Sequence, residues 1–207
     1  SNYITPEQAA SMGALALWLY KSQRTVLGRF LIGPAIVNIS LWTRLARALA
    51  GGDWAALKVW AVHLPLAALL LWALERNTAI TAWHYCFGIA YPALGLAMLR
   101  SLYEHRPGAL PAHRTVINEA AAPWRLLYLN NNYHVVHPAY PPLPWYQIPA
   151  LYAAEPAVWQ AGNGGFVLPG YMHLIRNFAW RTVDDPVLAA PVTAPARKTS
   201  PKRVPAK

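Results

Sequence analysis

The chain has 207 residues, of which 56% are hydrophobic and 13% are charged. This charged share is about half that of an ordinary soluble domain and favours a membrane protein. The 10 Trp and 11 Tyr fit a chain whose aromatic rings lie at the lipid headgroup level. The net charge is +10, but the aromatic residues are not interleaved with the basic ones as a single-strand groove requires, so no nucleic acid partner is expected. Cys86 is the single cysteine, which excludes a disulfide framework and a cysteine-based zinc site.

The first fifty residues predict helices that lie in the membrane interface. Residues 5–8, Thr-Pro-Glu-Gln, form a helix start in which Gln8 can close a capping box, and this helix should run to about residue 20. Residues 25–50 are mostly apolar but carry several arginines, which favours a bent interfacial helix over a clean span. Gly51-Gly52-Asp53 then breaks the chain, and Asp53 can cap the next helix.

Two apolar stretches are long enough to cross a bilayer. Residues 55–74 and residues 78–99 would each span roughly 30 Å of hydrocarbon as a helix. The connection between them, residues 75–77, is very short. We therefore expect the two spans to form a tight transmembrane hairpin.

The arginines around this pair predict its orientation. Arg44 and Arg47 precede it and Arg100 and Arg106 follow it, whereas the connecting turn carries one arginine beside Glu75. Basic residues concentrate on the cytoplasmic side of a membrane. Both outer ends of the pair, and the histidine-containing segment after it, should therefore be cytoplasmic.

The remainder of the chain predicts a cytoplasmic cap. A helix is expected from about residue 123 to residue 137, a glycine-rich turn at residues 162–165 and a short amphipathic stretch at residues 171–180. The Pro/Ala/Lys composition of residues 186–207 fits a disordered basic tail. The predicted fold is an all-α integral membrane protein with one transmembrane helical hairpin, interfacial helices and a cytoplasmic helical cap. Residues 1–185 should form one membrane domain.

Three histidines and two asparagines are the candidate site residues. His134 and His137 are three residues apart on the expected helix, with Asn130 or Asn131 about one turn earlier on the same face. His105 follows the second apolar stretch. Imidazole nitrogens suit iron, zinc and copper, and without thiolates a site of nitrogen and oxygen donors is the kind available. Taken alone, two histidines at this spacing are a weak signal, because polar residues at a helix end are the more common explanation.

The order of the motifs is more specific than any one of them. An Arg-Ser-Leu-Tyr-Glu-His-Arg sequence at residues 100–106 follows the expected hairpin, and Leu-Asn-Asn-Asn-Tyr-His-Val-Val-His at residues 129–137 and Leu-Pro-Trp-Tyr at residues 143–146 come next. In this order the chain resembles the C-terminal half of membrane fatty acid desaturases, particularly bacterial ones, over about residues 24–181. The Arg-Thr-Val-Leu-Gly-Arg sequence that begins at residue 24 and the Asn-Gly-Gly-Phe sequence at residues 163–166 are part of the likeness.

The resemblance implies a di-iron site at the cytoplasmic face and an O₂-dependent oxidation of acyl chains in lipid metabolism. His134 and His137 match the first two histidines of the family's third histidine box, and His105 resembles an additional ligand. Asn130 and Asn131 would orient a ligand. The implied location is the bacterial inner membrane, and the implied partners are a membrane lipid or acyl chain and an electron donor of ferredoxin or cytochrome type.

Two departures from the family pattern bear on the metal site. Pro138 stands where the third box has its third histidine, and proline supplies no donor atom. The other two boxes have no match among the seven histidines. From these departures we expect a truncated desaturase whose activity, if any, needs histidines that precede this sequence.

Two further hypotheses stay open from the sequence. The chain could be a catalytically inactive membrane protein that binds lipid or serves as a partner subunit, since it lacks most of the expected ligands. Alternatively, His105, His134 and His137 could hold a single metal ion, because three protein ligands are the number found at catalytic zinc sites.

Overall fold

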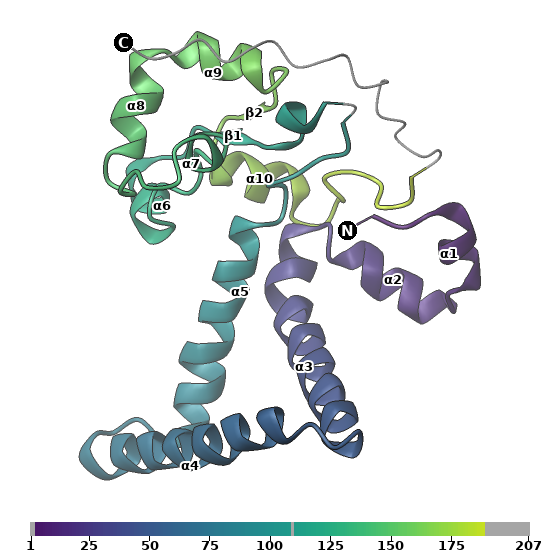
Figure 1. Cartoon of the computed structure of the whole chain (residues 1–207), viewed down its shortest axis with the longest axis vertical. Helices are drawn as coiled ribbons and strands as arrows, with labels where there is room; N and C mark the ends of the chain where they lie inside the picture. Colours follow the sequence, from purple (N-terminus) through teal and green to yellow (C-terminus); the bar gives the residue numbers. More distant parts are fainter. Residues whose placement is uncertain (1–2, 109, 189–207) are drawn as a thin grey trace. The chain divides into compact units, whose positions relative to one another are not determined.

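The computed structural model describes residues 3–108 and 110–188. These residues are mostly helical and fall into two compact units, whose elements are labelled in Figure 1. We call residues 10–102 with 174–186 the helical unit, and residues 3–9, 103–173 and 187–188 the site unit. The single membrane domain expected over residues 1–185 stays a prediction.

The helical unit is built from α-helices joined by two π-helical segments. Its elements in chain order are α2 (Ala14–Ser22), η1 (Gly28–Ile32), α3 (Gly33–Ala50), α4 (Trp54–Asn77), η2 (His84–Ala90) and α5 (Tyr91–Arg100).

The helix expected from residue 5 to residue 20 is divided into two. The capping box is present, because the Thr5 backbone N–H donates to Gln8 Oε1 at 2.9 Å and the Gln8 N–H donates to Thr5 Oγ1 at 3.3 Å. The first helix, α1 (Pro6–Ser11), ends before Gly13, which is extended and caps the start of α2. An extended glycine at this point ends one helix and begins the next.

Within the helical unit, α5 packs closely against η1 and α3. A methyl group added to Gly95 would lie 2.6 Å from the Phe30 carbonyl oxygen, and one added to Gly33 would lie 2.7 Å from the end of the Met98 side chain. The Arg29 side chain also donates to the Met98 carbonyl at 3.3 Å. The missing side chain at Gly95 therefore lets the backbones of α5 and η1 approach within contact distance, and Gly33 leaves room for the Met98 side chain.

The helix α4 is the one described helix that is long and apolar enough to cross a membrane by length and composition. Its start is capped as expected, since Asp53 accepts a hydrogen bond from the Ala56 N–H at 3.0 Å. None of its most apolar window is buried within the protein. The exposed large apolar residues along it are Trp54, Leu57, Val59, Val62, Leu64, Leu66, Leu69, Leu70 and Trp72.

The transmembrane hairpin expected from residues 55–74 and 78–99 is not seen. The helix α4 continues through Asn77, and the next helical residue is residue 82. Figure 1 shows α4 running across the direction of α5 rather than alongside it. The physical reason is that the Gly95 face of α5 packs on η1, so the close partner of α5 is the earlier helical segment.

The site unit combines short helices with one pair of parallel strands. Its elements are η3 (Pro111–Arg114), β1 (Ile117–Asn118), α6 (Ala122–Leu127), α7 (Val136–Ala139), α8 (Ile148–Ala154), α9 (Pro156–Gly162) and β2 (Val167–Leu168). The strands pair Ile117 with Val167 and Asn118 with Leu168. The all-α prediction is therefore corrected to a mostly helical fold with one pair of two-residue parallel strands. A strand of two residues is too short to show the alternating pattern by which strands are recognised in a sequence.

A small core holds the site unit together. Its buried members are Ile117, Tyr133, Val136, Ile148 and Tyr152. The rings of Tyr133 and Tyr152 stack with centroids 4.6 Å apart. This core joins β1, the turn before α7, and α8.

The single helix predicted from residue 123 to residue 137 is wrong. The helix α6 ends at Leu127, and Leu129 and Asn130 follow with positive φ angles of 50° and 54°. The Asn130 side chain donates to the Trp145 carbonyl at 3.0 Å, and the buried Asn132 side chain donates to the Asn118 carbonyl at 2.6 Å. Asparagine tolerates the left-handed region and competes with helical hydrogen bonds, so these residues form a turn.

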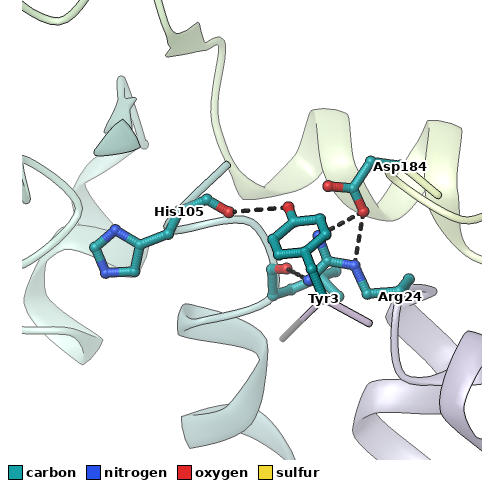
Figure 2. A network of polar contacts seen from close by, with 5 residues as sticks. Tyr3, Arg24, His105 and Asp184 are labelled. Atoms are coloured by element: carbon teal, nitrogen blue, oxygen red, sulfur yellow. Dashed lines mark hydrogen bonds and ion pairs between the residues drawn. The ribbon is translucent and has the colours of Figure 1, made fainter. Parts of the chain in front are cut away.

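Residues near both ends of the described chain, Tyr3 and Asp184, make polar contacts within their units (Figure 2). In the site unit, the Tyr3 hydroxyl donates to the His105 carbonyl at 3.3 Å. In the helical unit, the Arg24 guanidinium donates from Nε to Asp184 Oδ1 at 2.7 Å and from Nη2 to the same oxygen at 2.5 Å.

The last helix, α10 (Tyr171–Phe178), lies within the expected amphipathic stretch. Most of the basic tail predicted for residues 186–207 lies outside the described residues.

Candidate metal centre

Three potential metal ligands come together in the site unit. They are Glu104, His105 and His134, and one donor atom from each lies within 4.8 Å of the other two. Glu104 and His105 lie in the segment that follows α5, and His134 lies in the turn before α7. The cluster therefore joins two segments that are about thirty residues apart in the sequence.

Backbone pairing holds Glu104 and His105 in place. The Val116 N–H donates to the Glu104 carbonyl at 3.1 Å, and His105 forms an isolated antiparallel bridge with Thr115. The Arg106 N–H donates to the Arg114 carbonyl at 3.0 Å. Glu104 lies in a bend directly before this bridge, so the two adjacent side chains can both contribute a donor atom to the same group.

The core and two polar side chains position His134. Its neighbours Tyr133 and Val136 are both buried in the core cluster. Its Nδ1 atom is 3.1 Å from Asn131 Oδ1 and 3.5 Å from Glu104 Oε1. The imidazole therefore has oxygen acceptors facing Nδ1.

The three ligands differ in their access to solvent. Glu104 is buried, His134 is half-buried and His105 is exposed. The two imidazole rings lie edge to face, with centroids 5.1 Å apart. A buried carboxylate is stabilised by a positive partner, which an imidazolium or a metal ion can supply. The exposed side at His105 leaves the group open to a further ligand.

The structure brings two of the three predicted metal ligands together. His105 and His134 belong to the group, whereas His137 lies exposed on α7 and is outside it. Of the two asparagines expected to orient a ligand, Asn131 contacts His134, and Asn130 donates instead to the Trp145 carbonyl. The asparagines act from a turn and not from the face of a helix.

Glu104 is the member of this candidate group that sequence reasoning did not include. It is adjacent to His105 in the Glu-His-Arg motif, so the sequence signal was a carboxylate beside a candidate ligand. Carboxylate oxygen and imidazole nitrogen are both common donors to transition metals. Its burial and its 3.5 Å approach to His134 could be known only after folding.

The glycine-rich turn after α9 supports the segment that carries the ligands. The Arg106 guanidinium lies 4.3 Å from the centre of the Phe166 ring and donates to the Gly164 carbonyl at 3.2 Å. Gly164 has a φ of 67°, and a methyl group there would lie 2.8 Å from the His113 ring. The buried Asn163 side chain donates to the Thr115 carbonyl at 3.1 Å. These contacts explain why His113 packs on the turn.

The donor chemistry fits iron, but the number of donors fits one ion. Two imidazoles and one carboxylate form the set typical of non-haem Fe(II), and the same set also binds catalytic zinc. The di-iron centre expected from the resemblance needs a second group of donors. Among residues 3–108 and 110–188, no second group of three such side chains comes together. The described residues therefore do not by themselves fit a di-iron centre.

The comparisons with known proteins agree with the motif order. The family model for fatty acid desaturase matches residues 4–168, which is more than half of the chain and includes all three ligands of the candidate centre. No curated protein and no solved structure matches the chain at a significant level. The chain belongs to the fatty acid desaturase family.

Proposed function

We propose that this protein acts in lipid metabolism as a membrane-bound member of its family that takes part in the O₂-dependent oxidation of an acyl chain. The observation that carries the proposal is the convergence of Glu104, His105 and His134 in a chain whose family model covers all three. The family implies a di-iron cofactor and acts on acyl chains.

The roles of the chain's own residues follow from their positions. Iron, when bound, supplies the activation of O₂ that oxidation of an unreactive methylene requires. Glu104, His105 and His134 would contribute ligands, and Asn131 would hold the His134 ring through Nδ1. The buried Glu104 carboxylate offsets positive charge in the group. We propose no further catalytic residue.

Membrane attachment is part of the proposal. The helix α4 offers a continuous apolar surface of sufficient length, and its exposed leucines, valines and tryptophans suit lipid. A bacterial inner-membrane location with the histidine-containing segment in the cytoplasm is the orientation that the arginine distribution favours. The electrons would come from a ferredoxin- or cytochrome-type donor, whose acidic surface the basic chain would attract.

Lipid analysis after expression tests the proposed function. We expect membranes of bacteria that express the chain to contain oxidised acyl products, either unsaturated or hydroxylated, that are absent with His134→Ala at equal protein level. Gas chromatography with mass spectrometry of the released fatty acids is the measurement. Acyl profiles that are the same for the unaltered chain, His134→Ala and an empty vector would contradict the proposal for this chain.

A second candidate function is lipid binding or subunit assembly without catalysis. The observation in its favour is the small number of donors, with Pro138 beside His137 and His137 outside the cluster. This candidate expects the His134→Ala variant to retain lipid copurified with the unaltered chain and to produce no change in acyl composition. Loss of an acyl product in His134→Ala would refute it.

A further inference from the structure

We propose that the chain binds a single divalent first-row transition-metal ion through Glu104, His105 and His134. This differs from the two irons implied by the family, and it replaces His137 by Glu104 in the single-metal hypothesis drawn from the sequence. The inference depends on the geometry of the donors and not on acyl oxidation.

The spacing of the three donors suits one ion. Ligand atoms bound to one transition metal at about 2.0–2.2 Å can be at most about 4.4 Å apart. The three donors here lie within 4.8 Å of one another. Because 4.8 Å is only slightly more than this limit, small side-chain rotations would bring the three donors onto one ion while the backbone at Glu104 and His105 stays paired.

Asn131 orients the His134 ring beside Glu104. Asn131 Oδ1 lies 3.1 Å from His134 Nδ1, and Glu104 Oε1 lies 3.5 Å from the same nitrogen. A polar neighbour that contacts a ligating histidine fixes the direction of its ring. Asn131 is therefore a positioning residue.

The remaining histidines of the site unit, His113, His137 and His173, lie outside the group. The His113 ring packs against Gly164, and His137 is exposed on α7. Pro138 has no side-chain donor. Among the described residues, the donors that converge thus number three and not the larger set that two ions need.

The donor types define the class of ion. Two nitrogens and one oxygen favour Fe(II), Zn(II) and neighbouring ions, whereas Mg²⁺ and Ca²⁺ prefer oxygen ligands throughout. Two neutral imidazoles and one carboxylate leave a net positive charge when a divalent ion is bound. The exposure of His105 keeps one side available for an additional ligand.

Metal analysis of the full chain tests the inference. The chain purified in detergent without chelating resin is loaded anaerobically with Fe(II) or, in a parallel sample, with Zn(II), and free metal is removed. Plasma mass spectrometry should find one ion per chain with either metal, and none with Mg²⁺. His105→Ala and His134→Ala should each remove the ion, and Glu104→Gln should weaken binding by at least about 10-fold.

Matched variants separate this site from other arrangements. His137→Ala and His113→Ala should still bind one ion, because these histidines lie outside the group. Asn131→Ala should keep the stoichiometry of one but bind about 10-fold more weakly, as loss of an outer partner does. Circular dichroism and gel filtration identify any variant that fails to fold, and His105→Gln and His134→Gln then replace the alanine variants.

Several outcomes would overturn the single-ion site. They are two ions per chain, no bound Fe(II) or Zn(II), an ion retained in folded His105→Ala or His134→Ala, unchanged affinity in Glu104→Gln, or an ion lost in folded His137→Ala. The proposed function fails separately, through unchanged acyl profiles. One ion without acyl products supports this inference alone, and two ions with acyl products support the proposed function alone.

Discussion

At the residue scale, the Tyr152 hydroxyl shows how burial and hydrogen bonding act on one group. The hydroxyl donates to Glu119 Oε1 at 2.6 Å and accepts from Gln160 Nε2 at 2.9 Å. Burial of the phenol and the bond to Glu119 raise the pKa of Tyr152 from 10.0 to about 12. The folded state therefore favours the neutral phenol.

This pKa shift gives a prediction about alkaline stability. A group whose pKa is raised by folding stabilises the protein below its unfolded pKa, and that contribution is lost as the pH rises from 10 to about 12. Tyr152→Phe should lower the free energy of unfolding by about 1 kcal/mol at neutral pH, through loss of a hydrogen bond. The loss of stability between pH 10 and about 12 should be smaller in this variant than in the unaltered chain.

Denaturant unfolding followed at neutral and alkaline pH measures both effects. Tyr146→Phe is the control, because Tyr146 is 63% exposed and this substitution should change neither quantity. Equal alkaline losses in Tyr152→Phe and the unaltered chain would show that Tyr152 is not the group responsible.

At the element scale, two glycines in consecutive helical segments, Gly88 in η2 and Gly95 in α5, have different surroundings. Gly95 on α5 faces the Phe30 backbone, whereas nothing lies within 4 Å of a methyl group placed on Gly88 in η2. The packing of α5 against η1 and α3 therefore depends on the missing side chain at Gly95. This packing is also where the hairpin prediction and the structure diverge.

The contrast between the glycines predicts opposite effects of alanine. Gly95→Ala should destabilise the protein by about 1–3 kcal/mol, because its methyl group would be forced against the Phe30 carbonyl and ring. Gly88→Ala should be neutral or should stabilise by up to about 1 kcal/mol, since alanine favours helical backbone and no neighbour obstructs it. Thermal unfolding in detergent compares the two, and equal midpoints would rule out the close packing at Gly95.

At the scale of the whole molecule, both units are completed by chain segments from distant parts of the sequence. In the helical unit, Arg24 is joined to Asp184 by an ion pair, and the Val183 N–H donates to the Arg24 carbonyl at 2.9 Å. The Arg24 side chain is 4% exposed and that of Asp184 is 19% exposed. In the site unit, Ile4 pairs with Val187.

Loss of the acidic partner should be costly because Arg24 is buried. Asp184→Ala should lower the free energy of unfolding by about 3 kcal/mol, the lower end of the effect of breaking a buried ion pair. Asp185→Ala is the control, since Asp185 is exposed. Hydrogen exchange should show faster exchange of the Val183 amide in Asp184→Ala only. Unchanged exchange and stability in Asp184→Ala would mean that the ion pair does not hold this segment.

The sequence by itself determined the family, the mostly helical character and two of the three residues of the candidate metal centre. Residues 5–8 and Asp53 predicted helix starts that the structure confirms, because capping depends on side chains a few residues away. The order of the Glu-His-Arg and Asn-Asn-Asn-Tyr-His motifs predicted the family, because the order and spacing of motifs can be read from the chain without its fold.

Only the tertiary structure decided how the ligands combine and where α5 packs. Glu104 joins His105 and His134 because the segment around it pairs with Val116 and because the core fixes the turn at His134. His137, three residues farther along, lies outside the group because the expected helix is replaced by a turn with Asn130 in the left-handed region. Burial, long-range pairing and close backbone approach involve residues far apart in sequence, so no local pattern contains them.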